Sequence, residues 1–170
     1  PALTLTVDGE DTLDDFTADV MLGTDGESRL GGQVRIRAEK AGEDGVRESD
    51  MRVDADFSGD LRPLFEEQYQ PFFGGESLLH LEGARFPNGT IRVEDLFVRT
   101  DALNLRGDTS INDKGWPERV NLTGRVANAD GSPTTLPASG EPTRISALDL
   151  DFDYDSLRGE RWTGSFDLTG

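Results

Sequence analysis

The chain contains no cysteine among its 170 residues, which excludes thiolate catalysis, zinc–thiolate sites and disulfides. It also contains no glycine-rich phosphate loop, no signal peptide and no apolar run long enough to span a bilayer. Its one histidine, His80, lies on the polar phase of "LLHLE", without the serine or cysteine arrangement of a catalytic triad. We therefore expect a surface histidine, and we expect no catalytic residue, no cofactor and no metal ligand.

Basic residues are few relative to acidic ones, with 17 Lys and Arg against 34 Asp and Glu. The resulting net charge of −17 repels phosphate backbones, so nucleic acid is not an expected partner. The same charge disfavours a peripheral grip on anionic lipid headgroups. Many acids also offer many carboxylate pairs of the glycosidase kind. Because no pair of carboxylates stands out as catalytic, an enzyme is favoured less than the two interpretations given at the end of this subsection.

What the sequence does have is apolar residues at every second position. "LTLTV" at 3–7 alternates in this way, and both ends of the chain lie inside such runs. This indicates a single β-rich segment, residues 1–170, that is part of a longer protein. One-sided strands are typical of antiparallel sheets, so we expect an all-β fold of about ten strands. The further alternating segments are 16–22, 33–39, 51–57, 77–83, 90–100, 103–111, 119–126, 147–155 and 161–169.

A motif of two alternating apolar residues followed by glycine recurs along the chain. Gly59 and Gly83 are 24 residues apart, and so are Gly83 and Gly107. A period of this length fits one hairpin per unit, which suggests a repetitive sheet. A meander of similar strands would also resemble itself, and the sequence leaves both explanations open.

Residues 60–75 break the alternation and place apolar side chains near one helical face. Asp60 is positioned as N-cap, Pro63 fits the first turn, and Pro71 limits the length. We expect a helix of one or two turns whose phenylalanines pack on the apolar side of the sheet. Two stretches, 41–50 and 127–143, have the composition of loops.

The segment "ALDLDFDYD" places four aspartates at alternate positions, 149 to 155. In a strand these carboxylates lie on one face, about 7 Å from one to the next. Calcium needs six to eight oxygens that converge on one point, usually from a tight loop. A straight ladder spreads its oxygens, so we interpret the aspartates as a solvated strand face. Arg144 or Arg161 on neighbouring strands would reduce the repulsion between the carboxylates.

From "LRPLFEEQYQPFFGG" through the glycine-ended strands to "GWPERVNLTGRV", the order of parts resembles the TamB family of envelope proteins. The resemblance covers roughly residues 60–170. It implies an elongated, curled antiparallel sheet, a "β-taco" with an apolar groove, in a periplasmic segment of a protein anchored in the inner membrane. It also implies phospholipid movement between membranes, outer-membrane protein assembly with a TamA-like barrel partner, and no catalysis.

The alternation and the resemblance together select the residues expected to line the groove and to contact acyl chains. These are Leu103, Leu105, Val120, Leu122, Val126, Leu148, Leu150, Phe152, Trp162 and Phe166. The alternative is a β-sandwich module that binds carbohydrate or protein on a secreted or surface protein. A filled core with a site at the loop ends would distinguish the sandwich from an open groove.

Overall fold

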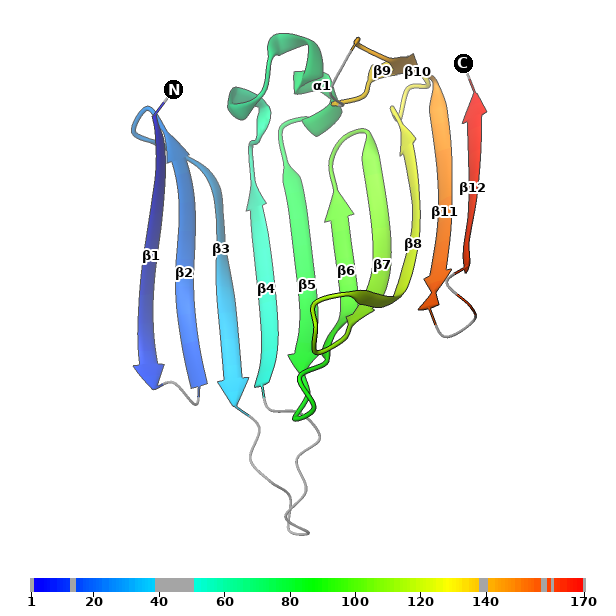
Figure 1. Cartoon of the computed structure of the whole chain (residues 1–170). Helices are drawn as coiled ribbons and strands as arrows, with labels where there is room; N and C mark the ends of the chain where they lie inside the picture. Colours follow the sequence, from blue (N-terminus) through cyan, green and yellow to red (C-terminus); the bar gives the residue numbers. More distant parts are fainter. Residues whose placement is uncertain are drawn as a thin grey trace.

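The computed structural model describes residues 2–12, 15–38, 51–137, 141–156, 159 and 161–169, without the side chains of 10, 11, 161, 162 and 169. Ten strands of these residues form one large sheet (Figure 1). They are β1 (Leu3–Thr12), β2 (Asp15–Thr24), β3 (Glu27–Ala38), β4 (Met51–Gly59), β5 (Ser77–Arg85), β6 (Ile91–Arg99), β7 (Leu103–Ile111), β8 (Pro117–Ala127), β11 (Ala147–Asp155) and β12 (Arg161–Thr169).

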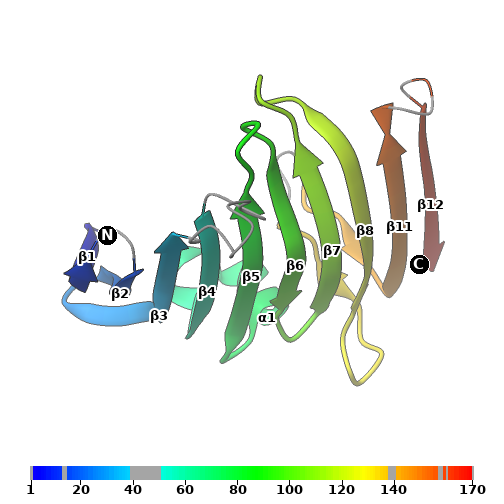
Figure 2. The ribbon, with the colours of Figure 1, turned by 90° about the horizontal axis from the view of Figure 1, so that it is seen from below.

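Every neighbouring pair of strands in this sheet is antiparallel, in the order β1-β2-β3-β4-β5-β6-β7-β8-β11-β12. The sheet does not close into a barrel, and β1 and β12 are the first and last strands in its order. Seen along the strands, the sheet twists and curls from one edge to the other (Figure 2). The predicted curled, antiparallel all-β fold of about ten strands is confirmed.

The register of these pairs sorts the alternating side chains onto two faces. Because residues directly opposite each other share a face, the pairings can be followed from strand to strand across the whole sheet. One such row contains only apolar residues and glycine. It runs through Val7, Val20, Gly32, Phe57, Leu79, Val98, Leu105, Gly124, Leu150 and Phe166.

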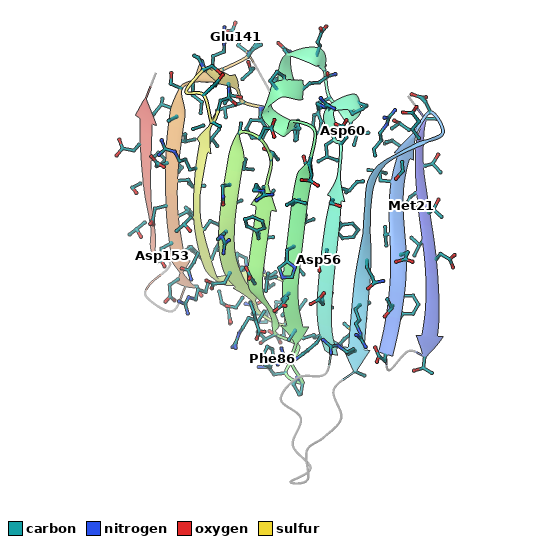
Figure 3. The ribbon with its side chains drawn as sticks, turned by 180° about the vertical axis from the view of Figure 1, so that it is seen from behind. Met21, Asp56, Asp60, Phe86, Glu141 and Asp153 are labelled. Carbon is teal, nitrogen blue, oxygen red and sulfur yellow. The ribbon has the colours of Figure 1, made fainter. Side chains whose placement is uncertain are left out.

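We call the side of the sheet that carries this row the apolar face, and the opposite side the polar face. A second row of cross-strand pairs, shifted by one residue and containing Asp56 and His80, defines the polar face. That row contains Asp8, Asp19, Gln33, Asp56, His80, Phe97, Arg106, Thr123, Asp151 and Ser165. Figure 3 shows the side chains along the strands, with Asp56 and Asp153 of this face labelled.

The glycines of the apolar row are covered by the larger side chain across the strand. A Cβ on Gly124 would lie 2.9 Å from the Leu105 Cδ1 atom and 2.8 Å from the Asn104 carbonyl oxygen. A Cβ on Gly32 would lie 2.6 Å from the Phe57 ring. Glycine therefore permits close approach at these positions, and its partner keeps the apolar row continuous.

The 24-residue glycine spacing corresponds to one hairpin per unit in only one of its two intervals. Gly59 lies in β4 and Gly83 in β5, one strand further, with the segment 60–76 between them. Gly107 lies in β7, two strands beyond Gly83. The interval from Gly83 to Gly107 is therefore the expected two strands, whereas the interval from Gly59 to Gly83 has the same length because of the inserted segment, so the equal spacing is not a regular structural repeat.

The segment 60–75 is helical, but in shorter pieces than predicted. Two 3-10 turns, η1 (Arg62–Leu64) and η2 (Glu67–Tyr69), precede the single-turn α1 (Gln70–Phe73). Asp60 is not the N-cap: its carboxylate accepts the Arg62 backbone N–H at 3.0 Å, while Leu61 occupies the cap position. Pro71 lies in the first turn of α1 rather than at the end of a longer helix, since its fixed φ suits a first turn.

The interval 127–143, expected as a loop, contains a short strand. β9 (Thr134–Thr135) pairs with β10 (Arg144–Ile145) in a separate two-stranded sheet beside α1, at one end of the large sheet (Figure 1). The predicted loop at 41–50 lies outside the described residues.

Candidate functional site: the apolar face

The apolar face carries the groove-lining residues expected from the sequence. Leu103, Leu105, Val120, Leu122, Val126, Leu148, Leu150, Phe152 and Phe166 lie on it by register. Trp162 is paired through its backbone with Tyr154, but its side chain lies outside the described residues. The alternation therefore placed the described candidates correctly on one side of the sheet.

Burial on this face is uneven. Val126 is 8% exposed, whereas Leu105, Leu122, Leu150 and Phe152 are only half-buried. Strand neighbours account for the partial cover of these residues, and no second sheet of comparable width lies over them. The middle of the apolar face is thus open enough to accept an apolar ligand.

One end of the face is capped by a small core, which we call the cap cluster. Its buried members are Phe72, Phe73, Ala102, Val126 and Ile145. Leu103 and Leu148 of the large sheet pack against them, as do Leu61, Tyr69 and Leu136. The cap cluster joins α1 and the β9–β10 sheet to the ends of β7, β8 and β11.

Hydrogen bonds hold α1 to the turn between β6 and β7. The Thr100 hydroxyl donates to the Phe72 carbonyl oxygen at 2.7 Å, and the Ala102 N–H donates to the same oxygen at 3.2 Å. The Ser77 hydroxyl donates to the Phe73 carbonyl oxygen at 3.3 Å. These bonds satisfy carbonyls at the end of a helix too short to use them internally.

The predicted packing of the segment's phenylalanines is correct for Phe72 and Phe73 and wrong for Phe65. Phe72 and Phe73 are buried, and their rings meet edge to face with centroids 5.3 Å apart. Phe65 stacks on Phe73 at 3.9 Å but remains 37% exposed. A charge at position 65 would consequently reach water instead of being buried.

Sequence reasoning missed Ala102, Leu136 and Ile145, which complete the cap cluster. Leu136 lies in the stretch interpreted as a loop, and Ala102 lies in a turn. The sequence feature that could have identified them is an aliphatic residue that stands alone among polar loop residues. Such a residue needs cover, and here the cap cluster supplies it.

On the polar face, the aspartate ladder of β11 is solvated at one end only. Asp149 and Asp151 are exposed, whereas Asp153 and Asp155 are half-buried. Asp149 accepts hydrogen bonds from the Arg125 guanidinium at 2.6 and 2.7 Å. For Asp149 the arginine therefore comes from β8, not from position 144, which lies in β10. Arg161 pairs through its backbone with Asp155, but its side chain lies outside the described residues. Among the described residues no group of three or more His, Asp or Glu could hold a metal ion.

His80 lies on the polar face within a cluster of carboxylates. Its Nδ1 atom is 2.7 Å from an Asp56 carboxylate oxygen, and its Nε2 atom is 3.8 Å from Glu82. The hydrogen bond to Asp56 raises the pKa of His80 above its ordinary value. No described serine or other nucleophile is hydrogen-bonded to this imidazole, so the geometry is that of a cross-strand ion pair.

Further ion pairs link the strands of the polar face. Arg35 reaches Asp15 at 3.2 Å, which lowers the pKa of that carboxyl, and Arg52 reaches Glu94 at 3.2 Å. Each exposed pair contributes little to stability. Together they keep the strongly acidic side of the sheet from repelling itself across neighbouring strands.

The chain matches no family model, no curated protein and no solved structure. Within the described residues, no helix combines the length and the apolar character needed to cross a membrane.

Proposed function

We propose that this chain is a non-enzymatic, TamB-like segment whose apolar face carries phospholipid acyl chains. The observation that supports this most directly is the row of apolar residues and glycine that crosses all ten strands. No polar side chain interrupts it, and half-buried residues such as Leu105 and Leu150 lie along it. A path across the strands would therefore remain apolar throughout.

The energetics suit movement more than tight binding. Each lipid CH₂ exposed to water loses about 0.8 kcal/mol of burial, so a two-chain lipid crosses an aqueous gap poorly. A wide apolar surface shelters the chains while the headgroup stays in water. An enclosing pocket would slow passage, and the open middle of the apolar face provides none.

The setting of this function is part of the same proposal. The segment would act in the periplasm, within a protein anchored in the inner membrane, and would work with a TamA-like barrel in the outer membrane. Support comes from the resemblance of residues 60–170 to that family.

The sandwich binding module receives less support from the geometry. A sandwich buries the inner faces of two sheets against each other. Here the second sheet has two strands of two residues each and lies with α1 at one end. It leaves the middle of the large sheet's apolar face without a facing layer.

Photo-crosslinking with a matched pair of neighbouring positions tests the proposal. A crosslinking residue at Leu105 lies on the apolar face, and one at Asn104 lies on the polar face of the same strand. With vesicles of zwitterionic phospholipid, position 105 should capture lipid and position 104 should not. Failure to capture lipid at both Leu105 and Leu122, or equal capture at Asn104, would exclude the proposed path.

A further inference from the structure

The apolar face carries a single arginine at the end of the strands away from the cap cluster. We call this end the open end; Figure 3 labels Phe86 there and Asp60 at the cap end. In β4 to β8 and β11, Arg85 is the only charged residue that pairs in register on this face. Its row at the open end is otherwise apolar and contains Met51, Arg85, Ile91, Ile111 and Pro117.

Arg85 is exposed and has no partner within the protein. In the part of the chain that the structure describes, its guanidinium makes no ion pair, hydrogen bond or ring contact. The chain has twice as many acidic as basic residues, so carboxylate partners are abundant. A cation that served only to neutralise them would lie on the polar face, whereas Arg85 lies between Met51 and Ile91.

Two neighbouring arginines at the open end show the contrast. Arg92 pairs in register with Ala84 on the polar face, and its guanidinium lies over the Phe86 ring, 4.8 Å from the centroid. Arg52, on the same face, reaches Glu94 at 3.2 Å. These side chains are engaged by groups of the protein itself, and the Arg85 guanidinium is left for an external anion.

Apolar side chains at the open end are exposed to water. Ile91 is 43% exposed, and Trp116, in the turn between β7 and β8, is 70% exposed. Tryptophan suits positions where an apolar surface meets water, because its ring is apolar and its N–H is polar. The open end thus combines one unpaired cation with an apolar surface, which matches a molecule that has an anionic group and a hydrocarbon part.

The length of the apolar face fits acyl chains that run along β5. The nine residues from Ser77 to Arg85 span about 26 Å at about 3.3 Å per residue. At the far end, the Ser77 hydroxyl donates to the Phe73 carbonyl oxygen of the cap cluster at 3.3 Å. One leaflet of a bilayer has a hydrocarbon layer of about 15 Å, half of the core thickness. Chains that start near Arg85 therefore end before the cap cluster, over Gly83 and Leu81.

We infer that Arg85 binds the phosphate of a phospholipid whose acyl chains lie on the apolar face and point toward the cap cluster. This inference rests on the proposed function and adds the class and the position of the headgroup. A guanidinium donates two parallel hydrogen bonds to phosphate oxygens. A zwitterionic headgroup carries no net charge, so the net charge of −17 does not repel it at long range.

Competition between two lipids with the same chains tests the phosphate contact. A crosslinking residue at Leu81, on the apolar face of the same strand, is exposed to phosphatidylcholine vesicles that contain a minor fraction of diacylglycerol. Mass spectrometry gives the ratio of phospholipid to diacylglycerol captured. Arg85→Gln should lower this ratio about tenfold, because diacylglycerol has no phosphate to lose. Arg85→Lys retains the charge and should recover part of the ratio.

Arg92→Gln is the matched control, since it removes the same charge at the same end but from the polar face. Its ratio should equal that of the protein with both arginines, and circular dichroism checks that each variant folds. An unchanged ratio in Arg85→Gln, or an equal fall in Arg92→Gln, would overturn the phosphate contact while leaving the apolar path intact. Capture of neither lipid by the protein with both arginines would instead refute the proposed function, and this inference with it.

Inorganic phosphate distinguishes a lipid headgroup from a free anion. Millimolar phosphate should leave the capture of phosphatidylcholine at position 81 unchanged, because burial of the chains supplies most of the binding. If millimolar phosphate abolishes that capture in a manner that depends on Arg85, the site takes a free anion and the lipid assignment is wrong.

Discussion

Gly124 provides a direct test of how tightly the apolar row is packed. In Gly124→Ala, the new Cβ would lie 2.8 Å from the Asn104 carbonyl oxygen and 2.9 Å from the Leu105 Cδ1 atom. The leucine can rotate, but the carbonyl belongs to the backbone of β7 and moves only with its strand. Overpacking of this kind costs about 1–3 kcal/mol. Lower chain entropy in the unfolded state returns about 0.4–1 kcal/mol.

The net expectation for Gly124→Ala is a free energy of unfolding lowered by about 1–2 kcal/mol, which corresponds to a Tm lower by about 2–8 °C. Urea denaturation followed by circular dichroism measures the change. The matched control is Gly31→Ala on the polar face, where the new Cβ meets only the Met21 Cγ atom, at 3.8 Å. That variant should be neutral or slightly stabilised. Equal stability of the two variants would refute the argument that close strand approach requires glycine at position 124.

Three further outcomes follow from the cap cluster and the polar face. Phe72→Ala should lower the free energy of unfolding by about 3–5 kcal/mol because Phe72 is 5% exposed, whereas Phe65→Asp, at a 37% exposed site, should cost about 1–2 kcal/mol in urea denaturation. The raised pKa of His80 predicts a stabilisation that is complete below its ordinary pKa of 6.5 and lost as the pH rises through the folded value. The stability difference from His80→Gln should therefore shrink as the pH rises above 6.5. Calcium titration followed by calorimetry should give no saturable site at Asp149 or Asp151, and a stoichiometric micromolar site would contradict the ladder interpretation.

The periodicity of the sequence was sufficient to predict the sheet and the face of the described groove-lining candidates. Alternation has a period of two, and a slip of one residue would expose every leucine of a strand, so register is strongly determined. Leu105 and Phe152 could be placed on the same face for this reason. The antiparallel direction of neighbouring strands followed because one-sided strands joined by short turns, such as the one containing Gly89, favour antiparallel pairs.

The cap cluster could not be predicted in the same way. Its members come from α1, the β6–β7 turn, β8 and β10, and their contacts depend on how the long connections return to the sheet. Ile145 pairs through its backbone with Thr134, within an interval whose composition indicated only a loop. The partner of Asp149 was missed for a related reason, because the Arg125 pairing depends on a β8–β11 register that spans the inserted β9–β10 sheet.

Thr100 links the cap cluster to the large sheet, and its side chain is nearly buried. Its hydroxyl donates to the Phe72 carbonyl oxygen at 2.7 Å and accepts the Leu103 N–H at 3.0 Å. Thr100→Val preserves the shape but removes both bonds and leaves the Leu103 N–H without that partner. The cost should be about 1–3 kcal/mol.

The effect of Thr100→Val should be larger near the cap than in the rest of the molecule. Loss of the bond to Phe72 loosens α1, whereas strands far from the cap, such as β2, keep their contacts. Hydrogen exchange of the Gly74 amide, which donates to the Gln70 carbonyl at 3.1 Å, should accelerate in Thr100→Val. Thr100→Ser retains the hydroxyl and should restore protection of that amide even though it lacks the methyl group. If Thr100→Val and Thr100→Ser exchange at the same rate, the methyl contact and not the hydroxyl holds α1, and the hydrogen-bond account of the cap is wrong.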